Sequence, residues 1–393
     1  MAKTLVVDKV EDTRVPFLRG ILTRSLQEVG LEFKHAYDFS SAIRNELSGV
    51  PEITTVELRE RVYRGLLRTD PRVARAYRMP AGVPARPMIR DFEGQVLPFS
   101  ELTYRRSLEA SGTDMETATT MARQLLEHLL MRREAVIPSA VLGRLTYGWL
   151  RRTQGEKIAR RYMVWVDYRQ QGRPLILLVG GTPGCGKSTV VAELANRLEI
   201  QRIQSTDMLR EVMRMLIPER LLPVLHRSSF NAWQALPTAT TARRPGPEAM
   251  ADGFRSQAEL LALPCEAVID RALKERVSLI LEGVHIEPSL HQRIEARGGA
   301  VVVPLTLAVF KSKQLRRRFA RRGRIAEERP PERYEQNFDA IWDLQSYLLD
   351  EADRCNVPIV NNDEKERAAH EIMGIVVDAL AEGFDKAPRE VFR

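Results

Sequence analysis

The alternation of apolar and polar positions changes character near residue 171. From there to residue 393, short apolar runs alternate with longer stretches whose apolar residues recur at helical spacing. The short runs predict five strands, at 175–180, 201–205, 277–282, 301–309 and 357–361. Strands that alternate with helices are typical of a parallel sheet that helices cover on both faces. We therefore predict that residues 171–393 form an α/β domain with a five-stranded parallel sheet, and that this domain folds without the residues before it.

The first 170 residues instead predict two mainly helical repeats. One motif recurs at a constant offset of 82 residues: Val15-Pro16-Phe17-Leu18, Arg24-Ser25-Leu26 and Gly30 return as Leu97-Pro98-Phe99-Ser100, Arg106-Ser107-Leu108 and Gly112. Each copy is expected to begin with a short strand or hairpin and to continue with roughly three or four helices. The proline-rich stretch 80–87 separates the copies, which predicts repeats at 1–84 and 85–170.

The composition is that of an ordinary soluble globular protein, with 44% hydrophobic and 28% charged residues. The formal net charge is +8, but most of the arginines are scattered through predicted helices, so nucleic-acid binding is not favoured. Cys185, Cys265 and Cys355 show neither metal-binding nor disulfide spacing, which favours a reducing cytoplasm. The longest apolar run, 300–310, is too short to span a bilayer, and residues 1–4 lead into charged sequence.

A phosphate-binding loop lies between the first predicted strand of the α/β domain and the helical stretch that follows it. Eight residues match G-x-x-x-x-G-K-[ST] at every fixed position, Gly181-Thr182-Pro183-Gly184-Cys185-Gly186-Lys187-Ser188, and Thr189 follows them. Glycines let backbone N–H groups surround phosphates, and the helix N-terminus adds positive charge. We expect this loop to bind ATP, with Lys187 at the terminal phosphates and Ser188 at the accompanying magnesium ion. Bulky thiol reagents are expected to inhibit through Cys185.

Two carboxylates are predicted to reach the same edge of the sheet as this loop. Asp207 follows the strand at 201–205, and Glu282 ends the strand at 277–282. Either carboxylate suits the support of magnesium or the acceptance of a proton from an attacking hydroxyl. Asp207 is also a favoured residue for capping the next helix. The sequence leaves open which of the two is the base and which supports the metal.

An arginine cluster at 311–330 predicts a lid. Its members are Arg316, Arg317, Arg318, Arg321, Arg322, Arg324 and Arg329. Arg318, Arg321 and Arg322 fall on neighbouring positions of one helical face. In a phosphotransfer enzyme such a face closes on the transferring phosphoryl group, so Arg318 and Arg322 are candidate catalytic residues. The alternative is a solvated basic helix.

The C-terminal domain resembles the 2-phosphoglycerate kinase family. The resemblance rests on short segments spread over 172–384: Ser205-Thr206-Asp207, Arg210-Glu211-Val212-Met213-Arg214, Leu225-His226, Ser228-Ser229-Phe230, Gly253-Phe254-Arg255-Ser256-Gln257, Leu281-Glu282-Gly283-Val284-His285-Ile286 and Arg333-Tyr334. It implies a P-loop kinase that makes 2,3-diphosphoglycerate from ATP and 2-phosphoglycerate. Such an anionic acceptor requires fixed cations, for which Arg210, Arg214, Arg255 and His226 are the candidates.

Each N-terminal repeat resembles the ATP-cone, a small nucleotide-sensing module. The resembling turns are Lys9-Val10-Glu11-Asp12 and Asp91-Phe92-Glu93-Gly94, each followed by the Pro-Phe motif. The resemblance implies nucleotide binding, and the alternative is a helical scaffold for dimerisation or for covering the kinase. Two other functions stay open for the whole chain. One is a kinase of another phosphorylated acid or polyol, and the other is an ATP-sensing regulator without small-molecule turnover.

Overall fold

The computed structural model describes residues 4–8, 13–77, 87–132, 136–237, 246–322 and 331–393. These residues form two compact units, one made mainly of 4–102 and 119–143 and the other of 103–118 and 144–391. The turn at 9–12, most of the stretch 80–87 and the arginines at 324 and 329 lie outside the described residues. None of the described helices is both long enough and apolar enough to cross a membrane.

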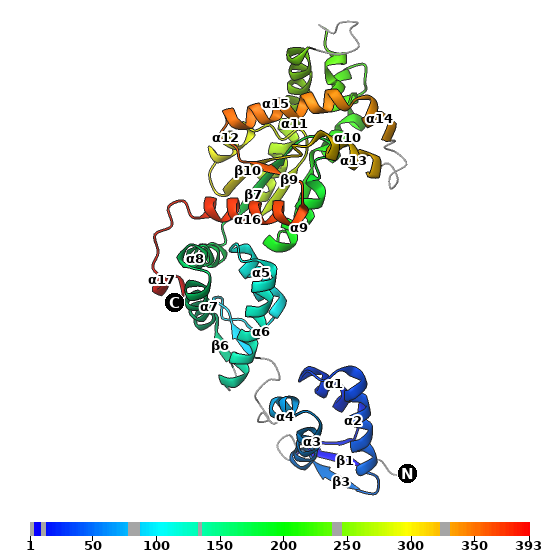
Figure 1. Cartoon of the computed structure of the whole chain (residues 1–393), viewed down its shortest axis with the longest axis vertical. Coiled ribbons are helices and arrows are strands. Elements are labelled where there is room, and N and C mark those ends of the chain that lie inside the picture. Colours follow the sequence, from blue (N-terminus) through cyan, green and yellow to red (C-terminus); the bar gives the residue numbers. More distant parts are fainter. Residues whose placement is uncertain (1–3, 9–12, 78–86, 133–135, 238–245, 323–330) are drawn as a thin grey trace. The chain divides into compact units, whose positions relative to one another are not determined.

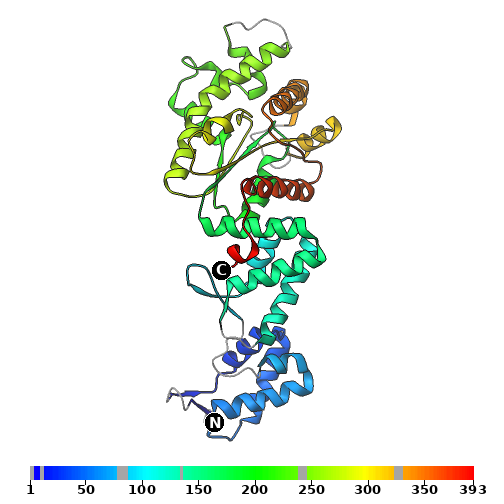
Figure 2. The same ribbon diagram turned by 90° about the vertical axis from the view of Figure 1, so that its left-hand side faces the viewer.

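The second unit contains a five-stranded parallel sheet in the order β11-β10-β7-β9-β8 (Figures 1 and 2). Its strands are β7 (Leu175–Gly180), β8 (Arg202–Ser205), β9 (Leu279–Glu282), β10 (Val301–Ala308) and β11 (Ile359–Asn361). Each lies within one of the five predicted apolar runs, so the predicted parallel sheet is confirmed. All six residues of β7 are buried, because helices cover both of its faces.

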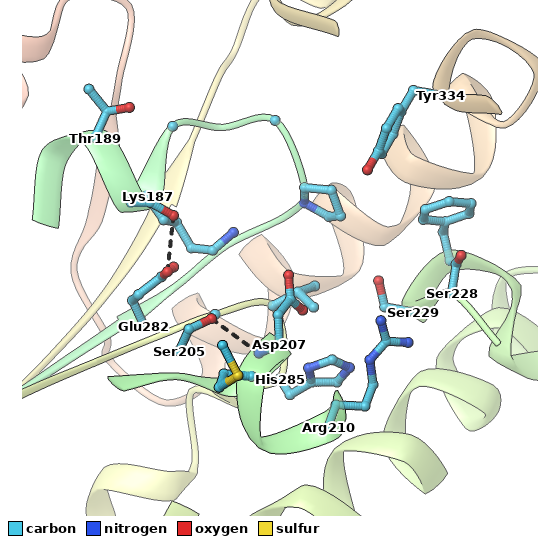
Figure 3. A pocket seen from close by; sticks show the side chains of 18 of the residues that line it. Lys187, Thr189, Ser205, Asp207, Arg210, Ser228, Ser229, Glu282, His285 and Tyr334 are labelled. Carbon is cyan, nitrogen blue, oxygen red and sulfur yellow. Dashed lines mark hydrogen bonds between the residues drawn. The ribbon is translucent and has the colours of Figure 1, made fainter. Parts of the chain in front are cut away.

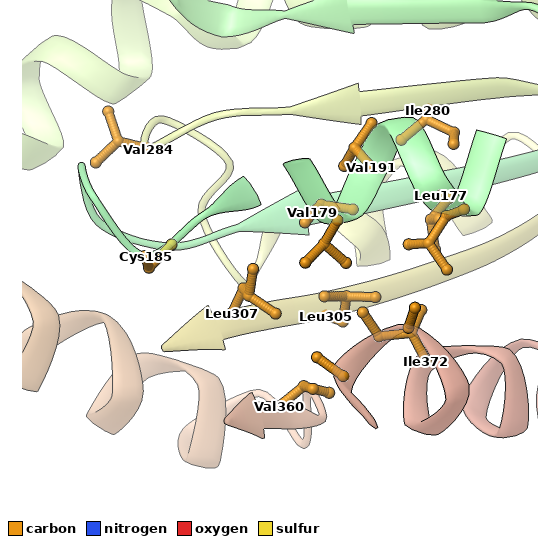
Figure 4. Close-up of a cluster of buried hydrophobic side chains, with 14 of the residues drawn as sticks. Leu177, Val179, Cys185, Val191, Ile280, Val284, Leu305, Leu307, Val360 and Ile372 are labelled. Carbon is orange, nitrogen blue, oxygen red and sulfur yellow. The ribbon is translucent and has the colours of Figure 1, made fainter. Parts of the chain in front are cut away.

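Alternate residues of β7 face two separate layers of side chains. Leu177 and Val179 pack with residues of α9 (Lys187–Leu198) and α16 (Lys365–Leu380), including Val191 and Ile372 (Figure 4). Ile176 and Leu178 pack with residues of α11 (Pro247–Lys274) and α12 (Leu290–Glu295). The alternation follows from the two-residue period of a strand.

The remaining helices of this unit surround the carboxyl ends of the strands or close the core. They are α10 (Thr206–Leu216), α13 (Ser312–Arg322), α14 (Pro331–Gln336), α15 (Phe338–Arg354), α17 (Pro388–Val391) and the 3₁₀ helices η1 (Pro223–His226) and η2 (Ser229–Ala235). Residues 238–245, between η2 and α11, lie outside the described residues, and α11 begins at residue 247.

Helix α8 (Glu156–Gln171) belongs to the same packed unit as the kinase sheet, which differs from the predicted division at residue 170. Its Trp165 is part of the core cluster that contains β7 and α16. Arg161 donates hydrogen bonds to both carboxylate oxygens of Asp378 of α16, at 2.6 to 3.0 Å. Because the buried face of α8 is covered by the kinase, residues 171–393 alone would expose part of their own core. This packing argues against the expectation that residues 171–393 fold independently, and truncated proteins are the test of it.

The N-terminal repeats have the same strand topology. In the first copy β1 (Leu5–Asp8) pairs antiparallel with β2 (Thr13–Pro16) and parallel with β3 (Glu52–Thr54). In the second, β4 (Met88–Arg90) pairs antiparallel with β5 (Val96–Pro98) and parallel with β6 (Val136–Pro138). The helices are α1 (Arg19–Glu28), α2 (Phe33–Glu46), α3 (Thr55–Thr69) and α4 (Pro71–Tyr77), then α5 (Glu101–Ala110), α6 (Met115–Arg132), α7 (Ser139–Thr153) and α8.

The spacing of these elements confirms the internal repeat. Helices α1 and α5 begin 82 residues apart, as do α2 and α6. Gly30 and Gly112 follow α1 and α5 with φ angles of +99° and +90°. Since this left-handed conformation favours glycine, the repeated glycine has a structural cause in both copies.

Candidate active site

A cavity of about 980 Å³ lies at the carboxyl ends of β7, β8 and β9 (Figure 3). The phosphate loop and α9 form one part of its wall, and α10, η2 and α14 form the part that faces them. Ten predicted site residues line it: Gly184, Gly186, Lys187, Ser188, Thr189, Asp207, Arg210, Arg214, Glu282 and Arg318. The parallel strands bring these residues together from distant parts of the sequence, because their carboxyl ends meet at one edge.

The phosphate loop requires its glycines for reasons of space as well as dihedral angle. Gly184 and Gly186 have φ angles of +82° and +93°. A Cβ atom on Gly184 would lie 2.5 Å from the ring of Phe319, and one on Gly186 would lie 2.5 Å from Nδ2 of Asn362. Lys187 Nζ donates to the carbonyl oxygens of Gly181 and Thr182, at 2.9 Å each. The lysine is therefore folded back over its own loop, within the cavity that phosphates would enter.

Ser188 and Glu282 form a pair beside the loop. The Ser188 hydroxyl donates to Oε1 of Glu282 at 3.0 Å, and Glu282 is 7% exposed at the end of β9 (Figure 3). Hydroxyl and carboxylate oxygens are ligands that Mg²⁺ accepts, usually together with phosphate oxygens and waters. Among the described residues no cluster of three or more His, Cys, Asp or Glu could hold a metal ion. The pair fits an ion that is also held by nucleotide phosphates.

Asp207 is the second residue of α10 and is not its N-cap. The N-cap of α10 is Ser205, whose Oγ accepts a hydrogen bond from the backbone N–H of Asp207 at 3.2 Å. The carboxylate of Asp207 instead lines the cavity, and in Figure 3 it lies between Lys187 and Arg210. The capping interpretation of this aspartate is therefore wrong, since a neighbouring serine has that role.

The far side of the cavity is rich in arginine. Arg210 and Arg214 come from α10, and Arg333 comes from α14 and donates to the Ser228 hydroxyl. Arg210 also donates to the carbonyl oxygen of Arg227 at 2.6 Å. Burial lowers the pKa of Arg210, and the charge of Asp207 opposes that shift. The buried Nε atoms of Arg210 and Arg214 have no hydrogen-bond partner within the described part of the chain.

Arg318 connects helix α13 to the phosphate loop. Its guanidinium donates to the carbonyl oxygens of Cys185, at 2.8 Å, and of Asn362. Asn362, which follows β11, donates to the same Cys185 oxygen at 2.7 Å. Arg321 of the same helix also lines the cavity. The side chain of Arg322, the other predicted catalytic arginine, lies outside the described residues.

Comparison with known proteins identifies the family. The chain is 33% identical over 286 residues to the 2-phosphoglycerate kinase of Pyrococcus horikoshii, which covers 73% of this chain and 92% of that protein. It is 35% identical over 297 residues to the 2-phosphoglycerate kinase of Pyrococcus furiosus, covering 74% and 93%. The chain belongs to the 2-phosphoglycerate kinase family. It is therefore a phosphotransferase, and the phosphate loop is its nucleotide-binding element.

No protein-family model matches the chain. Among solved structures, a shikimate kinase from Bacteroides thetaiotaomicron is similar over 51% of this chain and 98% of its own, with 16% identity and a TM-score of 0.29.

His226 and Arg255 do not line the cavity, although we expected both at the acceptor site of this 2-phosphoglycerate kinase family member. His226 ends η1, and its Nε2 hydrogen-bonds to the carbonyl oxygen of Ile217 at 2.9 Å. Arg255 lies on an exposed face of α11 and pairs with Asp252 at 2.6 Å. Each side chain therefore has a partner within its own part of the chain and is not among the residues that line the cavity.

The loop residues Gly181, Thr182 and Cys185 also do not line the cavity surface. The first two contribute the carbonyl oxygens that hold Lys187. The Cys185 side chain is fully buried in the core, although its carbonyl oxygen is the anchor for Arg318. A bulky thiol reagent cannot reach that sulfur in this conformation, so the expected inhibition through Cys185 is corrected.

Sequence analysis assigned no role to several residues of the cavity wall. They are Ser228, Ser229, Arg333, Tyr334, Asn362 and Lys365. Ser228, Ser229, Arg333 and Tyr334 lie in segments that carry the family resemblance. That resemblance was the signal in the sequence that could have indicated a role at the site. Ser228 and Phe230 contact Arg333 and Tyr334 of α14, and Asn362 and Lys365 come from the end of β11 and the start of α16, so their place at the site depends on packing between distant segments.

Proposed function

We propose that this enzyme transfers the terminal phosphoryl group of ATP to the free hydroxyl of 2-phosphoglycerate and forms 2,3-diphosphoglycerate. One observation carries the proposal: a single cavity has a phosphate loop on one side and three arginines on the other. A phosphate and a carboxylate on one small acceptor match that second set, since guanidinium groups bind both anions in bidentate fashion. Family membership supports the same substrate.

On the nucleotide side, Lys187 and the loop N–H groups hold the phosphates of ATP. Lys187 exchanges its contacts with the carbonyl oxygens of Gly181 and Thr182 for phosphate oxygens. Ser188 and Glu282 would hold Mg²⁺, which neutralises charge on the transferred group. In this assignment Glu282 is the residue that supports the metal.

On the acceptor side, Arg210, Arg214 and Arg333 bind the phosphate and the carboxylate. The buried Nε atoms of Arg210 and Arg214 support this assignment, because an incoming anion supplies acceptors that the described residues do not. Asp207 lies between the two halves and orients the attacking hydroxyl or accepts its proton. Arg321 stabilises charge on the transferred group from the lid.

The test is ATP consumption over a panel of acceptors, with the product identified by mass. The panel contains 2-phosphoglycerate, 3-phosphoglycerate, glycerol phosphate, other phosphorylated acids and nucleosides. We expect 2-phosphoglycerate to have the highest kcat/KM. Replacing Arg333 by Ala should raise the acceptor KM roughly ten-fold to a hundred-fold with little change for ATP, because a charge-assisted contact is lost.

Other outcomes favour the alternatives. Faster turnover of another phosphorylated acid or polyol would keep the kinase and change its acceptor. ATP binding without turnover of any acceptor would favour a regulatory ATP sensor. Better turnover of uncharged nucleosides, with Arg333→Ala unaffected, would contradict the anionic acceptor.

For the N-terminal repeats we propose an ATP-cone-like role in nucleotide sensing, which their shared topology supports. Full-length Lys187→Ala protein is the suitable test, since its kinase site should bind ATP poorly. Residual ATP binding in calorimetry would support sensing by the repeats. A complete loss of binding would favour a scaffold, and a change in mass by light scattering would report dimerisation through the repeats. The free thiols Cys185, Cys265 and Cys355 support a reducing cytoplasm as the location.

A further inference from the structure

We propose that Gln257 and His285 are positioning residues for the acceptor half of the cavity, which act by fixing the carbonyl oxygen that orients Arg210. This inference rests on the proposed function for the identity of the acceptor. Neither side chain was assigned a role from the sequence. Gln257 is fully buried on α11, and His285 is 3% exposed, three residues after Glu282.

The hydrogen bonds of Gln257 determine which of its atoms donate. Its Nε2 donates to the carbonyl oxygens of Val224, at 2.5 Å, and of Arg227, at 3.1 Å. An amide nitrogen has two hydrogens, so both are used. The Oε1 atom lies 2.8 Å from Nε2 of His285 and is therefore an acceptor. The imidazole Nε2 must carry a hydrogen and donate it to Gln257.

The protonation state of the other ring nitrogen of His285 follows from the same hydrogen bonds. Nδ1 is unprotonated and accepts a hydrogen bond from the hydroxyl of Thr206, 3.3 Å away at the start of α10. Burial lowers the pKa of His285 to about 3, and the ring stacks on Phe254 at an interplanar angle of 8°. The imidazole is neutral and both of its nitrogens are hydrogen-bonded within the protein. It therefore offers no charge to an anionic substrate, although its edge reaches the cavity wall. Its hydrogen bonds connect it to the acceptor arginines through Gln257 and through Thr206 of α10.

The Arg227 carbonyl oxygen joins this chain of hydrogen bonds to the acceptor site. It accepts from Gln257 at 3.1 Å and from Arg210 at 2.6 Å. A guanidinium is planar, so fixing one of its N–H groups on a held carbonyl restricts the direction in which the others point. Ser228, the next residue, accepts from Arg333. A shift of the segment that Gln257 holds would therefore displace two acceptor arginines together.

The first test is the kinetics of Gln257→Met, which keeps the side-chain length and removes both donors. We expect the KM for 2-phosphoglycerate to rise about ten-fold or more, as the loss of one oriented charged contact does, while the KM for ATP changes less than about three-fold. Ile269→Ala is the control for stability, because Ile269 is a fully buried residue of the same helix in the apolar cluster beneath the sheet. The control should lower the melting temperature and leave both KM values near those of the wild type.

Gln257→Glu separates the two functions of the amide. The ionised carboxylate accepts from His285 and donates to neither the Val224 nor the Arg227 carbonyl oxygen, and a protonated carboxyl group donates to one of them at most, so at least one of the two donated hydrogen bonds is lost. We expect an acceptor KM as poor as that of Gln257→Met. An acceptor KM near that of the wild type in both variants, or equal rises for acceptor and ATP, would overturn the proposal.

The second test needs no turnover. In ¹⁵N NMR of full-length wild-type protein, His285 should show a protonated Nε2, an unprotonated Nδ1 and no titration between pH 5 and 8. The opposite tautomer, or titration in that range, would overturn the proposal even if the variants fail to fold. Absence of 2-phosphoglycerate turnover by wild type would instead contradict the proposed function. The hydrogen-bond chain would then be judged by NMR and by calorimetry with inorganic phosphate in the Lys187→Ala background, where Gln257→Met should weaken the binding that remains at the acceptor arginines.

Discussion

At the scale of single residues, the side chains expected to act on ATP and magnesium make their contacts with the phosphate loop or with one another. Lys187 rests on two carbonyl oxygens of its own loop, so its removal leaves no buried partner charge behind. The Ser188 hydroxyl and the Glu282 carboxylate are already in contact. Substitutions at these positions should therefore affect chemistry more than folding.

We predict that Lys187→Ala abolishes phosphotransfer, with a loss in kcat/KM of more than about 100-fold, since a charged contact to the transferring phosphates disappears. The melting temperature should stay within a few degrees of that of the wild type. Steady-state kinetics and thermal unfolding on the same preparation provide the check. Near-normal turnover would contradict the assignment of the phosphate loop.

We predict that Glu282→Gln lowers kcat sharply and that added magnesium restores part of the loss, because the amide still offers one oxygen beside Ser188. Asp207→Asn should lower kcat without a magnesium response if Asp207 serves the acceptor hydroxyl. Titrations of each variant with Mg²⁺ distinguish the two roles. The opposite pattern would exchange the assignments of the two carboxylates.

A pH prediction follows from His285. Its pKa is lowered from 6.5 to about 3 by burial, so the folded protein keeps it neutral while the unfolded chain protonates it below about pH 6.5. Uptake of that proton favours the unfolded state, and the free energy of unfolding should fall by up to about 1.4 kcal/mol per pH unit below pH 6.5 from this group alone. Above pH 7 the effect vanishes. Denaturant unfolding of wild type and His285→Gln at pH 7.5 and 5 should show a smaller pH dependence for the variant.

At the scale of elements, α13 is joined to the phosphate loop by a hydrogen bond from the Arg318 side chain to a backbone carbonyl oxygen of the loop. Arg318 and Asn362 both donate to the carbonyl oxygen of Cys185, so the lid helix and the end of β11 hold the loop from the same side. Asn362 Nδ2 and the guanidinium of Arg318 are also the atoms nearest to where a Cβ on Gly186 would lie. In this conformation Arg318 stabilises the shape of the loop.

We predict that Arg318→Ala raises the KM for ATP by roughly ten-fold, because a loop with fewer fixed carbonyls binds phosphates less well. The acceptor KM should change little. Arg317→Ala is the matched control, since Arg317 is an exposed neighbour on the same helix. A loss confined to kcat, with an unchanged KM for ATP, would instead favour contact with the transferring phosphoryl group.

At the scale of the whole molecule, the packing unit of the kinase includes α8. Trp165 is buried in the kinase core, and Asp167 pairs with Lys386 at 2.7 Å. The first repeat has a cluster of its own, formed by residues between Val6 and Tyr77. These two observations give opposite expectations for two truncations.

We predict that deletion of residues 1–84 leaves a soluble, active kinase, whereas deletion of 1–170 lowers its stability or yields insoluble protein. Exposing a buried Trp site costs about 3–5 kcal/mol by comparison with large-to-small core substitutions, which is a large part of a typical domain stability. Expression, solubility and thermal unfolding of the two truncated proteins provide the measurement. Equal stability of the two would show that α8 contributes little.

The sequence by itself determined the sheet, the phosphate loop and the two carboxylates. Strand period and the glycine-lysine motif are local properties, and parallel strands bring their carboxyl ends to one edge whatever the rest of the chain does. Only the tertiary structure decided which cations face the acceptor. It brought Arg333 to the same side of the cavity as Arg210, left His226 and Arg255 outside the cavity lining, buried the thiol of Cys185 and attached α8 to the kinase. Those outcomes depend on how helices rotate and pack against distant segments, and side-chain direction is fixed by that packing.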